Sequence, residues 1–236
     1  MSGIELLCFD LDDTLWPCKP VIMRAEQEAY AWLQRQAPRL CARYSLQEMR
    51  QQRLQWLAEH PEWEHDLTEV RLRSLKTLLR RFDYPASLAV QATAVFRHWR
   101  NQVQPYPDVI PVLRHLRQSF TLVALTNGNV QLEQTPLHDS FDLFLSAAAV
   151  GAAKPHPALF EAVRDWSGIA FSRMLHLGDD PLRDVQAARR AGLHVVWVVR
   201  DPAMIWPLIE APKPQLVLAD LWPLQRRPQL LEDLPG

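Results

Sequence analysis

With 236 residues, 48% of them hydrophobic, the chain is long enough for one large α/β domain or for a core domain with a smaller insert. Its formal net charge of −1 argues against nucleic acid and an anionic membrane surface as partners, and no apolar run reaches the ~18 residues of a membrane span. Three cysteines that form no C-x-x-C pair, and an N-terminus without the basic region of a signal peptide, predict a protein of the reducing cytoplasm.

Short apolar runs predict six buried strands, and helical segments separate most of them. Strands that alternate with helices are typical of an α/β fold in which a parallel, Rossmann-like sheet is covered on both faces. Ligands of such sheets bind beyond the carboxyl ends of the strands, so functional side chains are expected there. The predicted strands are residues 4–9, 121–125, 143–147, 174–177, 194–199 and 216–218.

The first predicted strand ends in a pair of carboxylates, Asp10 and Asp12. A carboxylate can attack phosphorus as a nucleophile, while a neighbouring carboxyl of raised pKa can donate a proton to the leaving oxygen. An EF-hand calcium loop is excluded, because Leu15 and Val21 occupy the positions that require Gly and Glu. A solvated turn without chemistry remains the alternative, and Asp13 is expected to be a turn residue.

Between residues 16 and 105 the strand pattern gives way to helical periodicity. Apolar residues recur there at helical spacing, which predicts an inserted bundle of about four helices whose apolar stripes form a core. Two pairs mark helix starts by their capping pattern, Ser45 with Glu48 and Asp66 with Glu69.

Polar residues also follow the second strand and precede a later helix. Thr126, Asn127 and Gly128 offer a hydroxyl and backbone N–H groups that can hold phosphate oxygens, although an ordinary capped turn has the same composition. Lys154 comes directly before a predicted proline-initiated helix, where a compact ammonium can neutralise a phosphate near carboxylates. A surface lysine at a helix start is the alternative.

Acidic residues follow the fourth strand. Asp179, Asp180 and Asp184 lie at the start of a predicted helix, where acids commonly act as caps. Carboxylate oxygens are also the hard ligands that Mg²⁺ prefers. A magnesium site and a capped helix are therefore both consistent with this segment.

In chain order, the motifs Asp-x-Asp-x-Thr, Thr-Asn-Gly, Lys-Pro and Gly-Asp-x-x-x-x-Asp each lie at or after a predicted strand end. In this order and context they resemble the motifs of the haloacid dehalogenase superfamily, over roughly residues 1–15 and 106–200. The helical insert resembles the C1-type cap of that superfamily. The resemblance implies an HAD-like catalytic core at 1–15 and 106–236 and a cap at 16–105.

The resemblance further implies a phosphoryl-transfer mechanism in which two aspartates act in turn. Asp10 would attack phosphorus in line and form an aspartyl-phosphate. Asp12 would protonate the leaving oxygen and then act as base toward the hydrolytic water. Thr126, Asn127 and Lys154 would bind the transferring phosphoryl oxygens.

Mg²⁺ is the cofactor that the resemblance implies. The ion would be held by the Asp10 carboxylate, the Asp12 backbone carbonyl and the Asp179 carboxylate, while Asp184 and Asp180 would support it through water. Without the ion and the lysine, a phosphate dianion would meet several carboxylates at a cost of several kcal/mol.

Asp12 separates the reactions of the superfamily, because its dehalogenases and phosphonate-cleaving members lack an acid at that position. An ester oxygen needs a proton to leave, whereas a halide does not. We therefore expect a phosphatase that acts on small phosphomonoesters. A phosphomutase and a sugar-phosphate or nucleotide phosphatase are alternatives within the superfamily, and a binding module that keeps the fold without catalysis is the alternative class.

Several segments resemble the bacterial phosphatases of riboflavin biosynthesis. They begin at Lys19 (KPVI), His65 (HDLT), Arg71 (RLRSL) and Thr126 (TNGNVQ), whereas the segment WPC at Trp16 departs from the pattern of that group. The implied substrate is 5-amino-6-(5-phospho-D-ribitylamino)uracil or flavin mononucleotide.

Substrate choice is expected to depend on the cap and its hinges. Trp16 can stack on a planar ring there, with packing under the cap as its alternative. The sequence indicates no oligomeric state. The candidate specificity residues are Trp16, Lys19, Arg24, His65, Asp66, Arg71 and Arg73.

Overall fold

The computed structural model describes residues 3–206 and 212–231. The predicted catalytic core runs to residue 236, so its parts at 207–211 and 232–236 lie outside the described residues. The chain divides into two compact units. The sheet unit comprises Met1–Pro17, Gln104–Gly128 and Pro136–Gly236, and the helical unit comprises Cys18–Val103 and Asn129–Thr135.

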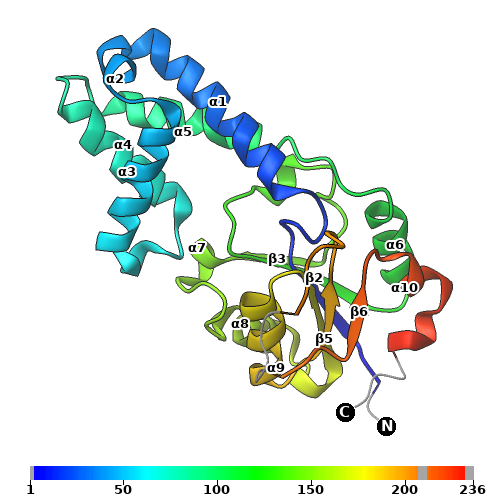
Figure 1. Ribbon diagram of the computed structural model, residues 1–236. Helices are drawn as coiled ribbons and strands as arrows, with labels where there is room; N and C mark the ends of the chain where they lie inside the picture. The colour runs from blue at the N-terminus through cyan, green and yellow to red at the C-terminus, as the bar shows by residue number, and fades with distance from the viewer. Residues whose placement is uncertain (1–2, 207–211, 232–236) are drawn as a thin grey trace. The chain divides into compact units, whose positions relative to one another are not determined.

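The sheet unit contains a six-stranded parallel sheet of order β3-β2-β1-β4-β5-β6, which confirms the predicted α/β class (Figure 1). Each predicted strand is present, with ends that differ by at most two residues. The strands are β1 (Leu6–Phe9), β2 (Thr121–Thr126), β3 (Leu143–Ser146), β4 (Met174–Gly178), β5 (His194–Val198) and β6 (Leu216–Leu218).

Strand β1 lies at the centre of the sheet, between β2 and β4. Its last residue, Phe9, is opposite Ala124 of β2 and Leu177 of β4. All of its residues are buried, as expected for a parallel strand that is covered on both faces. The carboxyl ends of β1, β2 and β4 therefore meet at one edge of the sheet.

Helices cover both faces of this sheet (Figure 1). Side chains of α8 (Ala158–Ser167) and α9 (Ala187–Ala191) pack with those of β1 and β2 in one buried cluster. Helices α6 (Val109–Leu116) and α10 (Trp222–Arg226) lie on the other face. The remaining short elements of the sheet unit are α7 (Ala147–Val150), η3 (Phe171–Arg173), η4 (Pro181–Gln186) and η5 (Pro228–Leu231).

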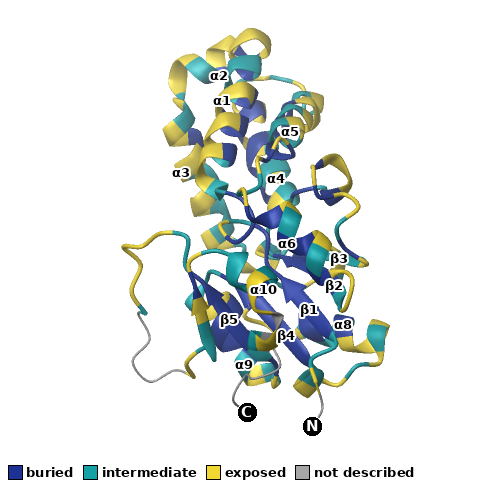
Figure 2. Ribbon diagram, turned by 90° about the vertical axis from the view of Figure 1, so that its right-hand side faces the viewer, coloured by how far each residue is buried: buried dark blue, intermediate teal, exposed yellow. Residues whose placement is uncertain are grey.

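The helical unit has five α-helices, where the sequence predicted about four. The additional helix is the short α2, which is separate because Pro38 at its start lacks the N–H that a continuous helix would need. Figure 2 shows buried and exposed faces alternating along these helices, as the predicted apolar stripes require. The helices are α1 (Cys18–Gln36), α2 (Pro38–Arg43), α3 (Leu46–Glu59), α4 (Leu67–Arg80) and α5 (Ser87–Arg100), with η1 (Pro61–Trp63) and η2 (Leu132–Gln134) as short turns.

Both predicted capping residues begin helices. The Ser45 hydroxyl accepts from the Glu48 N–H at 3.2 Å, and the Glu48 carboxylate accepts from the Ser45 N–H at 2.7 Å, which completes a capping box. Asp66 accepts from the Glu69 N–H at 2.9 Å, but the Glu69 side chain pairs with Arg73 instead of reaching back. The start of α4 therefore has the Asp66 cap but lacks the reciprocal Glu69 bond that would complete a capping box.

Residues 129–135 cluster with the helical unit, although the sequence assigned them to the core. The side chain of Asn101, at the end of α5, binds this segment: its Nδ2 donates to Gln131 at 3.2 Å and Gln134 at 3.0 Å, and its Oδ1 accepts from the Gln131 N–H at 2.9 Å. Asn129 donates to the Thr68 hydroxyl at 3.2 Å. The turn that follows β2 thus continues directly into a segment bound by the helices.

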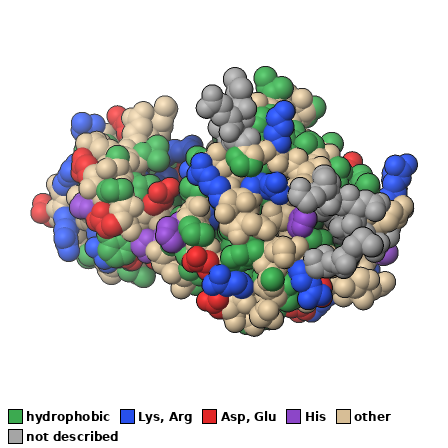
Figure 3. Space-filling model, turned by 90° about the horizontal axis from the view of Figure 1, so that it is seen from below, with side chains coloured by type: hydrophobic (Ala, Val, Ile, Leu, Met, Phe, Trp, Pro, Cys, Tyr) green, Lys and Arg blue, Asp and Glu red, His purple; other side chains and the backbone are tan. Residues whose placement is uncertain are grey.

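None of the helices in the described part of the chain is long and apolar enough to cross a membrane. On the face shown in Figure 3, acidic and basic side chains are interspersed.

Candidate active site

Asp10 is the first residue beyond the central strand. Its N–H donates to the Leu177 carbonyl at 2.8 Å, which continues the pairing between β1 and β4 by one step. The residue is only 7% exposed. A carboxylate is thus fixed at the edge of the sheet where ligands of parallel sheets bind.

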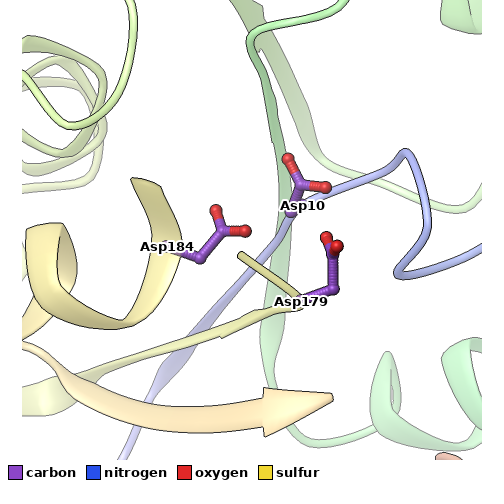
Figure 4. A group of neighbouring side chains, drawn as sticks. All are labelled: Asp10, Asp179 and Asp184. Carbon is purple, nitrogen blue, oxygen red and sulfur yellow. The ribbon is translucent and has the colours of Figure 1, made fainter. Parts of the chain in front are cut away.

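Asp10, Asp179 and Asp184 each offer an oxygen, and these oxygens all lie within 4.8 Å of one another. Figure 4 shows the three carboxylates converging from the ends of β1 and β4 and from η4. The Thr14 hydroxyl donates to Asp179 at 3.1 Å, and the Trp197 indole N–H donates to the Asp179 carbonyl at 2.7 Å. Asp179 is therefore held at both its side chain and its backbone.

Lys154 is buried, with 1% of its surface exposed, so the alternative of a surface lysine is wrong. The following helix begins only at Ala158, and the lysine lies in the turn before it. Its Nζ donates to Asp10 at 2.7 Å, to Asp184 at 2.6 Å and to the Leu125 carbonyl at 3.3 Å. The ammonium thus connects two of the clustered carboxylates.

The turn after β2 positions this lysine. The Asn127 amide donates to the Lys154 carbonyl at 2.8 Å and accepts from the Lys154 N–H at 2.8 Å. Thr126 is buried, and its hydroxyl accepts from the Gly128 N–H at 2.8 Å. The Asn127 side chain therefore binds the backbone that carries the ammonium, while the Thr126 hydroxyl faces into the turn.

Asp12 lies in a tight loop closed by Trp16. The Trp16 indole N–H donates to Asp12 Oδ1 at 2.9 Å, and the Asp13 N–H donates to the Trp16 carbonyl at 2.8 Å. Asp13 has a φ of 58°, in the left-handed region that Asp tolerates in turns. The Trp16 side chain is fully buried, so the structure favours packing over ring stacking for this residue.

Asp180 and Asp184 have different hydrogen-bond partners around η4. Asp180 Oδ1 accepts from the Leu182 and Arg183 N–H groups, both at 2.8 Å, and so caps the helix start. Asp184 accepts from the Asp180 N–H at 3.0 Å and from Nε2 of His176 at 3.0 Å. The sequence expected both to support a metal through water, whereas the Asp184 carboxylate lies in the cluster itself.

The electrostatics of the cluster show an excess of negative charge. Burial, which Lys154 offsets only in part, raises the pKa of Asp10 well above its ordinary value. Burial and then the neighbouring Asp184 raise the pKa of Asp179 to about 8. Burial also acts to raise the pKa of Asp184, but Lys154 and His176 together hold it below its ordinary value. One ammonium does not neutralise three carboxylates, and this hard oxygen set fits a divalent cation such as Mg²⁺.

A cavity of about 190 Å³ opens onto these groups. It lies wholly within the sheet unit, and Arg183 contributes a cation to its wall. The lining residues are Asp10, Asp12, Asp13, Thr126, Asn127, Gly128, Lys154, Asp179, Asp180, Arg183 and Asp184.

Sequence reasoning missed His176 and Arg200. His176 is fully buried in β4, and its presence within an otherwise apolar strand was the available signal. Arg200 donates through Nε to the Thr14 carbonyl at 3.0 Å and through Nη1 to Asp108 at 2.8 Å, and it thereby supports the loop that follows Asp10. Arg200 and Thr14 are 186 residues apart, so no local sequence pattern could have predicted this contact.

Two of the predicted specificity residues are solvent-exposed on α1. Lys19 lies in its first turn, and Arg24 donates to the Gln102 carbonyl with its guanidinium 5.2 Å from the centre of the Trp99 ring. Arg71 instead points into the helical unit.

The other candidates of the helical unit have structural partners. His65 stacks on Trp63 with ring centres 6.1 Å apart, and the Arg73 guanidinium lies 3.9 Å from the centre of the same Trp63 ring. Asp66 caps α4. These contacts account for the three side chains within the unit.

A Rossmann-like sheet with clustered carboxylates and a buried lysine beyond its central strand is an α/β fold with a candidate site where ligands of such sheets bind. The model of the haloacid dehalogenase-like hydrolases matches residues 4–192, and the chain belongs to this family.

Two curated relatives and one solved structure are similar to this chain over most of its length. The 5-amino-6-(5-phospho-D-ribitylamino)uracil phosphatase YigB of Escherichia coli K12 is 32% identical over 202 residues, 84% of each chain. The glyceraldehyde 3-phosphate phosphatase of Methanopyrus kandleri is 27% identical over 84% of each chain. A crystal structure of a 2-haloacid dehalogenase from Pseudomonas syringae pv. Tomato DC3000 is 33% identical, covers 97% of this chain and 98% of that one, and has a TM-score of 0.87. The chain is a phosphatase by class, as the sequence predicted.

Proposed function

We propose that the chain is a Mg²⁺-dependent phosphomonoester hydrolase that works through an aspartyl-phosphate on Asp10. The observation that carries the proposal is the position of this carboxylate, at the end of the central strand, 2.7 Å from Nζ of Lys154 and among two further carboxylates. A carboxylate can attack an anionic phosphate when cations offset the charge between them; Lys154 is one such cation, and a bound Mg²⁺ would supply the rest.

In the first half-reaction, an oxygen of Asp10 attacks phosphorus while the bond from phosphorus to the ester oxygen breaks. Asp12 gives its proton to that leaving oxygen, so the alcohol departs neutral. In the second half-reaction, Asp12 takes a proton from water, and the water oxygen displaces Asp10 from phosphorus. The Trp16 N–H bond to Asp12 supports this role, because it holds the carboxyl in one orientation.

The phosphoryl oxygens need donors that are in place before the reaction. Lys154 provides an ammonium whose position is set by Asp10, Asp184 and the Asn127 amide. Thr126 provides a hydroxyl at the end of β2. We assign phosphate binding to Lys154 and Thr126, and to Asn127 mainly through its hold on the lysine.

The proposed metal ligands are the Asp10 carboxylate, the Asp12 backbone carbonyl and the Asp179 carboxylate, with Asp184 and Asp180 in support. The oxygens of Asp10 and Asp179 that lie within 4.8 Å of each other favour this assignment. Burial raises the pKa of both carboxyls, so a bound cation would offset the cost of their charge. When bound, Mg²⁺ supplies positive charge that offsets the charge of the phosphate and orients it.

Hydrolytic dehalogenation is the second candidate, since the Pseudomonas syringae structure bears that name at 33% identity. Asp12 is the residue that opposes it, because a halide leaves without a proton. A parallel assay with 2-chloropropionate separates the two reactions. Release of chloride at a rate comparable with phosphate release from an ester would favour the dehalogenase.

The substrate we propose is 5-amino-6-(5-phospho-D-ribitylamino)uracil, which the name of the Escherichia coli relative gives. Flavin mononucleotide, which the sequence resemblance implies, is the alternative substrate. The helical unit is the proposed cap, with Lys19 and Arg24 as candidate specificity residues, whereas Arg71 lies against Glu26 inside the unit. The sequence, whose three cysteines form no C-x-x-C pair, supports the reducing cytoplasm as its compartment. A panel of kcat/KM values for both flavin-pathway phosphates, sugar phosphates and nucleotides, with product analysis for mutase activity, tests this assignment.

The primary test is hydrolysis of p-nitrophenyl phosphate with Mg²⁺ and with excess EDTA. Asp10→Asn should lower kcat by about 10³-fold or more, because an amide is not a competent nucleophile. Asp165→Asn, an exposed carboxylate on α8, makes the same charge change away from the cavity and should keep wild-type activity. Wild-type protein that is inert across metals and substrates would favour a non-catalytic binding module, and full activity in Asp10→Asn would refute the nucleophile.

A further inference from the structure

A second cavity, of about 40 Å³, lies inside the helical unit between α1, α3, α4 and α5. Its wall is mostly apolar and includes Leu33, Met49, Leu75, Leu78 and Ala92. A water needs about 10–15 Å³ of such space, so there is room for roughly three waters or for a ligand with a short alkyl chain.

One side of this cavity is charged. Glu26 is 4% exposed, and its Oε1 accepts from Nη2 of Arg53 and lies 3.5 Å from Nη2 of Arg71. The Arg71 guanidinium also lies 3.4 Å from the centre of the Phe96 ring. Two guanidinium groups thus share one carboxylate, which leaves one positive charge in excess.

The excess charge is accompanied by an unused donor. Nε of Arg71 is buried and has no hydrogen-bond partner within the described residues. Burial, followed by repulsion from Arg53, lowers the pKa of Arg71 to about 9. A guanidinium binds a carboxylate strongly through charge-assisted N–H bonds, and Arg71 borders the cavity.

We propose that this cavity binds a small organic monocarboxylate, whose carboxylate pairs with the Arg71 guanidinium and whose alkyl chain contacts Met49, Leu75 and Leu78. A single negative charge balances the excess of the Glu26, Arg53 and Arg71 group. A phosphate dianion would instead carry a further negative charge toward the Glu26 carboxylate. All the residues involved belong to the helical unit, so the proposal is independent of the phosphatase mechanism.

Butyrate is a suitable probe, and the full chain saturated with Mg²⁺ and inorganic phosphate is the sample. Methyl-labelled Met49, Leu75 and Leu78 should shift saturably on titration with sodium butyrate at constant ionic strength, with intermolecular nuclear Overhauser effects to the butyrate chain. Arg71→Gln should raise the Kd about tenfold or more, because a charge-assisted bond is lost. Arg80→Gln, an exposed arginine on the same helix, should leave it unchanged.

If circular dichroism shows that Arg71→Gln does not fold, butyramide provides a test that needs only the wild-type protein. Butyramide has the same shape without the charge and should bind about tenfold more weakly or worse. The proposal is overturned by an absence of saturable shifts, by equal binding of butyramide and butyrate, or by equal binding to a folded Arg71→Gln. Shifts confined to the neighbourhood of Thr126 and Lys154 would place butyrate in the active site and would also overturn it.

Discussion

Each unit of this protein contains a buried cluster of charged side chains, and the two clusters are out of balance in opposite directions. In the sheet unit, one lysine lies among three clustered carboxylates, those of Asp10, Asp179 and Asp184, and pairs with the first and the last. In the helical unit, one carboxylate, that of Glu26, pairs with both Arg53 and Arg71. Because an unbalanced charge is costly in a protein interior, its sign indicates the sign of the missing partner. The first cluster fits a divalent cation and the second a monoanion.

The clusters also differ in how each is supported. Asp184 and Lys154 are bound to one another and to backbone groups on β2 and η4, so the sheet cluster is part of a rigid network. The helical cluster rests on three side chains from α1, α3 and α4 and borders a cavity. Substitutions in the two clusters should therefore lower the free energy of unfolding by different amounts.

Lys154→Met should have the largest effect. It leaves Asp10 and Asp184 buried without their ammonium, and the metal-free protein should lose about 4 kcal/mol of unfolding free energy in urea. Lys213→Met, at an exposed lysine, is the control and should change little. A loss of less than about 1 kcal/mol would mean that the carboxylates do not depend on this ammonium.

Glu26→Gln tests the helical cluster in the same way. Two guanidinium groups then face one another without a carboxylate, and the expected loss is about 3 kcal/mol in the same urea titration. Glu28→Gln is an exposed neighbour on α1 and serves as the matched control. Equal stability of the two variants would show that the arginines are already balanced by other groups.

Gly178→Ala probes the rigidity of the sheet cluster. An added Cβ would lie 2.4 Å from Cγ of Asp184, whose carboxylate is held by Lys154 and His176 and has little room to move. We expect a loss of about 2 kcal/mol by urea denaturation. Gly3→Ala meets no atom within 4 Å and is the control. An unchanged Gly178→Ala would show that Asp184 can shift freely.

The last effect, which is the smallest when taken per pH unit, should be a pH dependence that only the sheet cluster has. Burial and Asp184 raise the folded-state pKa of Asp179 to about 8, above its unfolded value of 3.8. Between these values the folded state binds the extra proton, so stability of the metal-free protein should fall as pH rises, by about 1 kcal/mol per pH unit. The arginines of the helical cluster stay protonated and add no such slope.

Thermal melts from pH 5 to pH 7, with and without Mg²⁺, measure this slope. Asp179→Asn should reduce it without abolishing it, because the raised pKa of Asp10 gives a slope of the same sign. Saturating Mg²⁺ should stabilise the wild-type protein more at pH 8 than at pH 6, since the ion competes with the proton. An identical slope in Asp179→Asn and wild type would assign the titration to another group.

The sequence by itself determined the strands, their parallel arrangement and the order of the motifs, because apolar runs and turn residues are local signals. It also predicted the caps at Ser45 and Asp66 for the same reason. It placed Asp10 and Lys154 in one mechanism through a resemblance, and it left open whether Lys154 lies at the surface.

Only the tertiary structure decided which charges are buried together. Lys154 and Asp10 are 144 residues apart and meet because Asn127, which follows β2 beside β1, binds the backbone of Lys154. Arg71 and Glu26 are 45 residues apart and meet because α1 and α4 border one cavity. Burial and charge balance depend on such long-range neighbours, which no local pattern encodes, and for this reason the second cluster became visible only in the folded chain.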